Sequence, residues 1–354
     1  MIDYLTCRIV LPRPLPRTID DGCTIRRAQD GTVRQVTAHR LGVVGSFEAV
    51  LQLRSVSLTE LEVQGNPAKF LQGHNLYGST DLPQLLWDAL SVALPASPAA
   101  CTPAHVGIAS PALLDGVVTR VDLTHMFELG SEADVTAWLR TAELVAHIAR
   151  RGKGVMHGNT LVMGSASGKS FTTWQIVLYA KGSEVRARPL PAPMMQHPSV
   201  LTWVARNLRV EVRFGRLELA KLGLRSLAMW AGLVERDYGD LWRAKVDQLE
   251  FNLGDREFDV DTLPRQLRTT YVAWTTGADV RNLLSRATFY RYRAQLLKLA
   301  GVDISVPPPI QPTAEIVPLR RVIEVKPCGR PEWADEVDAL LRASGRMVFP
   351  PIAA

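Results

Sequence analysis

The chain has 354 residues, of which 47% are hydrophobic, so it can bury a large core within one large domain or two. Its formal charge of +6 is compatible with a polyanionic partner. No apolar stretch reaches the roughly 18 residues that a membrane span needs, and no secretory signal pattern opens the chain. The four cysteines show no metal-type spacing, so we expect free thiols in a reducing compartment. Together with the missing membrane span and signal pattern, this predicts no membrane association and a cytoplasmic location.

Alternation of apolar and polar residues predicts that the first 215 residues are rich in β-structure. In SLTELEVQ, for example, Leu61 and Val63 point to one side, whereas Glu60 and Glu62 point to the other. We expect strands at 1–12, 42–64 (as a hairpin), 117–126, 158–164, 171–181 and 206–214, and helices at 83–94 and 133–151.

From about Leu217 the apolar residues recur at helical spacing. The stretch after Pro307 is first proline-rich, and we expect it to be extended. The sequence therefore predicts three regions, 1–215, 216–306 and 307–354. The fold class is α+β, with an antiparallel β-sheet flanked by helices and followed by a mainly α-helical region.

The segment LEVQGNPAKFLQGHNLYGSTDL at 61–82 concentrates residues that favour turns and helix ends. Asn66 can cap a short helix, Pro67 suits its first turn, and Gly73 can end it in the left-handed region. His74 and Asn75 then follow a rigid turn. A tight surface connection would have the same composition. Local physics therefore does not decide between such a connection and a turn that presents His74 and Asn75 for function.

The sequence of this segment resembles the signature of the replication initiators of filamentous phages, the gene II protein family. Further segments resemble the same family in the same order. They are MIDYLTCRIVLP at the start, RVDLTHMF at 120–127, LVMGSASGKSFTTWQIVLYAKGSEV at 161–185, LRVEVRF at 208–214, LLSRATFYRYRAQLLKLAGVDI at 283–304, and IVPLRRVIEV near 316–325. The resemblance implies a fold like that of replication-initiator nucleases.

Tyr179 matches the family's nucleophile, which forms a 5′-phosphotyrosyl link to DNA. On a strand, Tyr179 and Lys181 would share a face with Val177. A phenol with a pKa near 10 is a poor nucleophile at neutral pH, and a neighbouring cation favours its ionised form. Lys181 could also stabilise charge on the phosphorus. Without the resemblance, a core tyrosine would be the simpler interpretation.

Acidic residues lie on several of the matched strands and suggest an oxygen-ligand site for Mg²⁺ or Mn²⁺. Asp122 and Glu211 are the first candidates, Glu62 follows, and Asp3 and Glu184 come last. His74 is a further candidate ligand, although it could equally contact phosphate or fix the turn. Many tyrosine nicking enzymes use a His-hydrophobic-His pair, but none of the seven histidines forms one. An acid-dominated site is therefore expected.

Basic residues could bind DNA in both halves of the chain. On the expected strands they are Arg120, Arg209 and Arg213. In the segment 283–304, Ser285 can cap a helix on which Phe289, Tyr292, Leu296 and Leu299 form an apolar stripe. A polar stripe of Thr288, Arg291, Gln295 and Lys298 runs beside it, preceded by Arg286. The segment resembles a helix-turn-helix element, although a packed helix with one solvated face would look the same.

The resemblance implies that residues 1–215 nick and rejoin DNA at a phage origin, and that 216–306 bind DNA. The expected partners are double-stranded origin DNA, single-stranded DNA, and a host helicase and polymerase. The same chemistry could serve a plasmid or conjugation. The rival from another class is a non-catalytic DNA-binding regulator, which would not need Tyr179, Lys181 or the acids.

Overall fold

The computed structural model describes residues 1–149, 151–164, 171–251, 260–276, 278–300, 302, 304–305 and 327–348. Most of the Gly/Ser-rich turn at 164–170 and the stretch at 316–325 lie outside these ranges. Within the described ranges, no helix combines the length and the apolar character needed to cross a bilayer.

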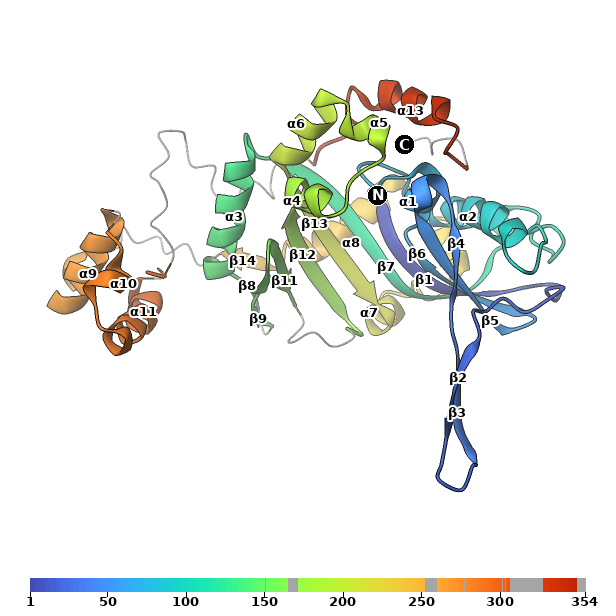
Figure 1. Cartoon of the computed structure of the whole chain (residues 1–354), viewed down its shortest axis with the longest axis horizontal. Helices are drawn as coiled ribbons and strands as arrows, with labels where there is room; N and C mark the ends of the chain where they lie inside the picture. The colour runs from blue at the N-terminus through green and yellow to red at the C-terminus, as the bar shows by residue number, and fades with distance from the viewer. Residues whose placement is uncertain are drawn as a thin grey trace.

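A nine-stranded antiparallel sheet organises the molecule (Figure 1). The spatial order is β10-β11-β12-β13-β7-β1-β6-β5-β4. The bounds are β1 Ile2–Val10, β4 Leu41–Val44, β5 Val50–Ser57, β6 Glu60–Gly65, β7 Asp115–Glu128, β10 Val155–His157, β11 Thr160–Met163, β12 Trp174–Ala180 and β13 Asn207–Gly215. The expected antiparallel sheet flanked by helices is confirmed.

Alternation along the strands gives this sheet one apolar face and one polar face. The apolar face includes Leu5, Val63, Val121, Leu123, Ile176, Leu178, Val210 and Val212, which belong to the main core. The polar face carries Tyr4, Thr6, Glu62, Gln64, Arg120, Asp122, Thr124, Tyr179, Arg209, Glu211 and Arg213. Such a division leaves the second face free for polar chemistry.

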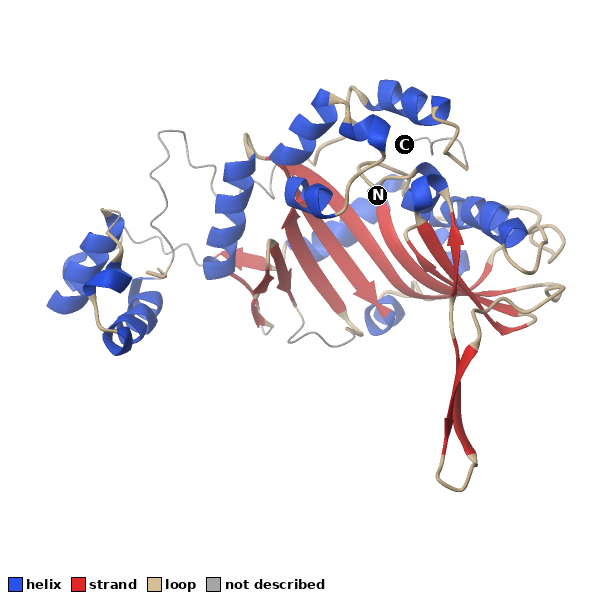
Figure 2. Cartoon of the chain, viewed as in Figure 1, coloured by secondary structure: helices blue, strands red, loops and turns tan. Residues whose placement is uncertain are grey.

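Helices cover the two faces differently (Figure 2). The main core is completed by side chains of α2 (Leu82–Ala96), α3 (Glu132–Val145) and α8 (Glu235–Val246). A second core takes Met126 from the polar face and packs it with α4 (Lys181–Ala187), α5 (Ala192–Met195), α6 (Pro198–Arg206) and α13 (Ala334–Ala343). These four helices gather at one end of the sheet in Figure 1.

The remaining elements are shorter or lie outside the main sheet. They are the 3-10 helices η1 (Ser46–Glu48), η2 (Pro111–Leu113), η3 (Leu227–Trp230) and η4 (Val260–Thr262), the helices α1 (Pro67–Gln72), α7 (Arg216–Lys221), α9 (Arg265–Thr275), α10 (Val280–Leu283) and α11 (Arg286–Ala300), and the strands β2 (Cys23–Arg27), β3 (Val33–Ala38), β8 (Ala146–Ile148), β9 (Gly152–Lys153) and β14 (Leu249–Phe251).

Three expected elements are corrected by tertiary contacts. The helix expected at 133–151 ends at Val145, because residues 146–148 pair with β14 from far along the chain. The strand expected at 171–181 ends at Ala180, and Lys181 begins α4, where it pairs with Glu184 one turn later. The tail expected to be extended contains α13, whose apolar side is buried in the second core.

Helices α9, α10 and α11 pack around a third apolar cluster and lie to one side of the sheet in Figure 1. On α11, Phe289, Tyr292 and Leu296 are buried as expected. Leu299 was expected to join them but is 51% exposed, and it lies in the last turn of the helix, outside the third apolar cluster. Thr288 was expected to be exposed and is half-buried near Ser285, which caps the helix.

Candidate active site on the polar face of the sheet

The signature segment forms the turn that its residues predict. Asn66 accepts a hydrogen bond from the backbone N–H of Lys69 at 2.8 Å, and Pro67 begins α1. Gly73 ends the helix at φ 86°, a conformation that favours glycine. A Cβ on Gly73 would also clash with the ring of Phe47, so this turn tolerates only glycine without rearrangement.

Helix α13 contacts and anchors the chain that follows this turn. Tyr77 donates its hydroxyl to Asp338 of α13 at 2.7 Å, and Arg330 donates to the other oxygen of the same carboxylate at 2.5 Å. Burial opposes ionisation of Asp338, but His74, Tyr77 and Arg330 together lower its pKa to about 2. His74 is fully buried beside it, 4.0 Å from the carboxylate, and burial lowers the pKa of its imidazole. His74 is therefore neutral at pH 7 and sequestered beneath α13.

Asp3 is the centre of a buried network that joins three distant parts of the chain. It lies at an irregularity of β1, where the pairing with β7 shifts register. Its carboxylate accepts hydrogen bonds from Asn66 at 2.6 Å and Asn75 at 2.8 Å, and it pairs with Arg209 at 2.8 Å. Burial raises the pKa of Asp3, but Arg209 and Asn75 reverse this effect, so the pKa is lowered overall and the carboxylate is ionised.

Lys181 supports this network from the start of α4. Its ammonium group donates to the side-chain oxygen of Asn75 at 3.0 Å and to Glu184 at 2.6 Å. Burial, together with the charge of Arg209, lowers the pKa of Lys181 to about 8. Because Lys181 is fully buried, it holds the signature loop in place. It does not share a strand face with Tyr179, which corrects the expected geometry.

Tyr179 lies directly across from Arg209 in the pairing of β12 with β13. Directly opposed residues of antiparallel strands place their side chains on one face, about 5 Å apart. Burial raises the pKa of the Tyr179 phenol well above 10, while Arg209 acts in the opposite direction. The arginine is itself fixed by Asp3, by Thr124 at 2.8 Å and by the backbone oxygen of Asn75 at 2.7 Å. The cation opposite the tyrosine is thus preorganised.

Asp122 and Glu211 lie on the same polar face, on neighbouring strands. Arg213 is 3.6 Å from Asp122 and 3.2 Å from Glu211, and Arg120 donates to Asp122 at 2.8 Å. Burial raises the pKa of both carboxyls, that of Glu211 to about 7 despite the opposing charge of Arg213. The charge of Asp3 raises both pKa values further, so negative charge is concentrated here.

The four expected metal ligands occupy three separate places. Only Asp122 and Glu211 share a neighbour, Arg213. Glu62 pairs with Arg40 at 2.6 Å and with Arg54 at 3.1 Å on the far side of β1, and His74 lies beneath α13. In the ranges that the structure describes, no cluster of three or more His, Cys, Asp or Glu side chains could hold a metal ion.

The expected DNA-binding residues divide between the polar face of the sheet and helix α11. Arg209 is fully buried, whereas Arg120 and Arg213 are half-buried and paired with carboxylates. Arg120 also covers the ring of Tyr4 at 4.3 Å. On α11 the expected side chains are exposed, namely Arg286, Arg291, Gln295 and Lys298. The α11 set is therefore accessible to a partner, and the strand arginines organise the polar face.

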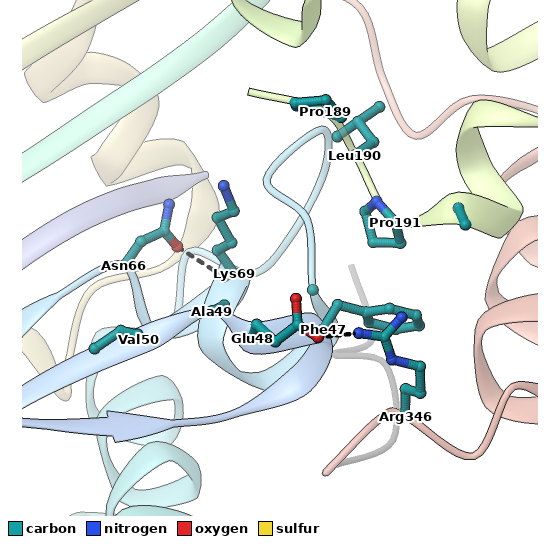
Figure 3. Close-up of a pocket in the computed structure, with 12 residues that line it drawn as sticks. Phe47, Glu48, Ala49, Val50, Asn66, Lys69, Pro189, Leu190, Pro191 and Arg346 are labelled. Carbon is teal, nitrogen blue, oxygen red and sulfur yellow. Dashed lines mark hydrogen bonds and ion pairs between the residues drawn. The ribbon is translucent and has the colours of Figure 1, made fainter. Parts of the chain in front are cut away.

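A cavity of about 430 Å³ opens beside the Asp3 network (Figure 3). Asn66 and Lys69 line one wall, and Pro189, Leu190 and Pro191 face them from the segment between α4 and α5. Phe47 lies at the other end, covered by Arg346 at 5.2 Å. Asn66 and Arg346 line this cavity, and Asn75 belongs to the neighbouring Asp3 network. None of the three was among the predicted site residues, although Asn66 and Asn75 lie inside the signature segment.

Comparison with known proteins agrees with this architecture. The family of the N-terminal part of the phage replication-associated protein, the gene II protein, matches residues 1–232, and the family of its C-terminal part matches residues 259–338. The replication-associated protein of this kind from Enterobacteria phage I2-2 is 33% identical over 362 residues, covering 98% of this chain and 99% of that protein. The chain belongs to the gene II protein family of filamentous phages.

The two family matches correspond to distinct parts of the structure. The N-terminal match contains the entire nine-stranded sheet and every residue of the Asp3 network. The C-terminal match contains α9 to α11 and the first residues of α13, including Asp338. No solved structure matches this gene II family member. The family resemblance expected from the ordered segments is confirmed.

Proposed function

We propose that this gene II family member initiates rolling-circle replication of a filamentous phage by nicking one strand of the double-stranded origin. The observation that carries the proposal is the Tyr179–Arg209 pair, set on a polar sheet face within a family of replication-associated proteins. A non-catalytic DNA regulator would need neither the opposed pair nor the buried network that fixes Arg209.

In the proposed reaction the phenolic oxygen of Tyr179 attacks the scissile phosphate. The new bond joins this oxygen to phosphorus, and the bond from phosphorus to the 3′ oxygen breaks. The 5′ phosphate stays on the tyrosine, and the leaving 3′ oxygen takes up the proton that the phenol gives up overall. Because the bond energy is retained in the phosphotyrosine, the reverse attack by a 3′ hydroxyl can rejoin the displaced strand without a nucleotide cofactor.

A neutral phenol is a poor nucleophile at pH 7, and Arg209 would counter this weakness. Its guanidinium favours the phenolate and stabilises negative charge that grows on the phosphate oxygens. Asp3, Thr124 and the backbone of Asn75 hold the guanidinium in place before DNA arrives. Lys181 acts one contact further away by fixing Asn75, so we assign it a positioning role.

A divalent ion fits the Asp122–Glu211 pair better than the full expected ligand set. Mg²⁺ is commonly held by one or two carboxylates, with substrate phosphates and water completing the octahedron. Burial is the main cause of the raised pKa of Glu211, and a bound cation would favour the ionised carboxylate there. Bound there, Mg²⁺ or Mn²⁺ would polarise the scissile phosphate. Glu62 and His74 lie outside this pair and are not part of the proposed site.

Origin recognition would use α9 to α11 as a helix-turn-helix unit. The exposed polar residues of α11 have the chemistry to contact phosphates and base edges in a major groove. After nicking in the cytoplasm of the bacterial host, the free 3′ hydroxyl would prime a host polymerase while a host helicase separates the strands. The displaced product would be single-stranded DNA.

The test is incubation with supercoiled origin DNA and Mg²⁺, followed by gels that resolve nicked circles and the covalent protein–DNA adduct. Wild type should give both products. Tyr179→Phe should give neither while binding the origin normally. Tyr238→Phe is the matched control, because it removes a tyrosine hydroxyl from α8 beneath the opposite face of the sheet. Nicking by Tyr179→Phe at the wild-type rate would refute the nucleophile, and a wild type that binds but never nicks would favour the regulator.

A further inference from the structure

The hairpin of β2 and β3 projects away from the sheet, as Figure 1 shows. All five residues of β2 are exposed, and so are Val33 to Thr37 of β3. The ribbon therefore adds almost nothing to the hydrophobic cores. An isolated two-stranded hairpin is only marginally stable in water, so its exposure calls for a partner.

The charge of this region identifies the chemistry of that partner. Residues 13–40 carry six arginines against three aspartates and have no lysine or glutamate. The register places Arg26 opposite Gln35 and Thr24 opposite Thr37, so these four side chains share one face of the ribbon. Arg34 is the extra residue where the pairing shifts between Arg26 and Arg27. A bulge of this kind reorients a side chain outward.

We propose that the β2–β3 hairpin is an arm that enters the major groove of the origin duplex. A major groove is about 12 Å wide and accepts a two-stranded ribbon, and arginine, glutamine and threonine are the residue types that contact base edges and phosphates. The proposal rests on the proposed function, which makes duplex DNA the ligand.

The arm is tied to the same face that carries Tyr179. At its base, Arg40 pairs with Glu62, which also holds Arg54 on β5. The hairpin leads directly into β4 at one edge of the sheet, and β12 lies six strand positions away. With about 4.8 Å between strands, the sideways separation is about 29 Å, and the pairing registers place Tyr179 about eight residues, or about 26 Å, further along the strand direction than Leu41, where the hairpin joins the sheet. The base of the hairpin and Tyr179 are therefore about 40 Å apart, the length of about twelve base pairs. One duplex can therefore reach the arm and the nucleophile together.

The first test compares duplex binding with single-strand cleavage for the variant Arg26→Ala/Arg34→Ala. We expect its affinity for duplex origin DNA to fall at least about tenfold at low salt, and the slope of log affinity against log salt to flatten by about 2. Cleavage of a single-stranded oligonucleotide that contains the nick site should be unchanged. The matched control is Arg225→Ala/Arg236→Ala, which removes two exposed arginines next to the main core beneath the apolar face.

A second measurement places the arm on DNA. Cys23 is exposed at the base of the hairpin, whereas Cys7 and Cys101 are buried. In a Cys328→Ser background, an iron chelate attached to Cys23 should cut the duplex on one side of the nick site only, at a distance of about twelve base pairs or more. Cuts that are absent or evenly spread would overturn the proposal.

The remaining outcomes are decisive as well. Unchanged duplex affinity and salt slope in Arg26→Ala/Arg34→Ala would show that the arm does not bind DNA and would direct the search to a protein partner. An equal loss in the Arg225→Ala/Arg236→Ala control would reduce the effect to overall charge and also overturn the proposal. Failure of wild type to cleave single-stranded DNA would instead count against the proposed function, while duplex binding still reports on the arm.

Discussion

Replacing Glu211 with glutamine should make the stability of the protein less dependent on pH. The carboxyl has a pKa of about 7 in the folded protein, against 4.5 for an unperturbed glutamate. Since the folded value is raised, its favourable contribution is fully present below pH 4.5 and is lost as the pH rises through 7. One pKa unit corresponds to about 1.4 kcal/mol, so the loss between pH 5 and pH 8 is about 2–3 kcal/mol.

The assay is urea unfolding of wild type and Glu211→Gln at several pH values between 5 and 8. The wild-type free energy of unfolding should fall by about 2–3 kcal/mol more than that of the variant over this range. Glu332→Gln, which replaces an exposed glutamate, is the control and should follow wild type. Parallel curves for wild type and Glu211→Gln would refute the argument that burial raises the pKa of Glu211 in the folded protein.

The same variant tests the proposed metal site without an activity measurement. If Asp122 and Glu211 hold a divalent ion, Mg²⁺ at pH 8 should raise the melting temperature of wild type, because a ligand that binds only the folded state stabilises it. Glu211→Gln should lose most of this increase. An equal increase in both proteins would place the ion elsewhere.

Further predictions concern packing and the helical region. Phe289→Ala should destabilise the α9–α11 cluster by about 3–5 kcal/mol in thermal unfolding, whereas Arg291→Ala should melt like wild type and lose affinity for origin duplex across a salt series. Gly73→Ala should cost at least about 1–2 kcal/mol, because its φ of 86° is left-handed. Asp338→Asn should lower stability above pH 4, the range in which the carboxylate is ionised, and the difference from wild type should shrink as the pH falls toward 2.

Local chemistry determined much of this protein from sequence alone. The short helix between Asn66 and Gly73 follows from a cap, a proline and a glycine, whose effects act within one turn. The division of each strand into two faces follows from the two-residue period of strands, which predicts that Asp122 lies on the same side of its strand as Arg120 and that Glu211 lies on the same side as Arg209. The six ordered segments indicated the gene II protein family, and the comparisons confirmed it.

Tertiary structure alone decided which of these residues meet. Asp3, Asn75 and Arg209 are far apart in sequence and converge because β1 lies between β6 and β7, with β13 on the other side of β7. No spacing rule predicts such strand order. The sequence also does not predict that Lys181 begins a helix instead of continuing a strand. Nor does it predict that α13 docks beside His74 and buries it. The partner of Tyr179 is thus Arg209, because the register of β12 on β13 sets them opposite each other.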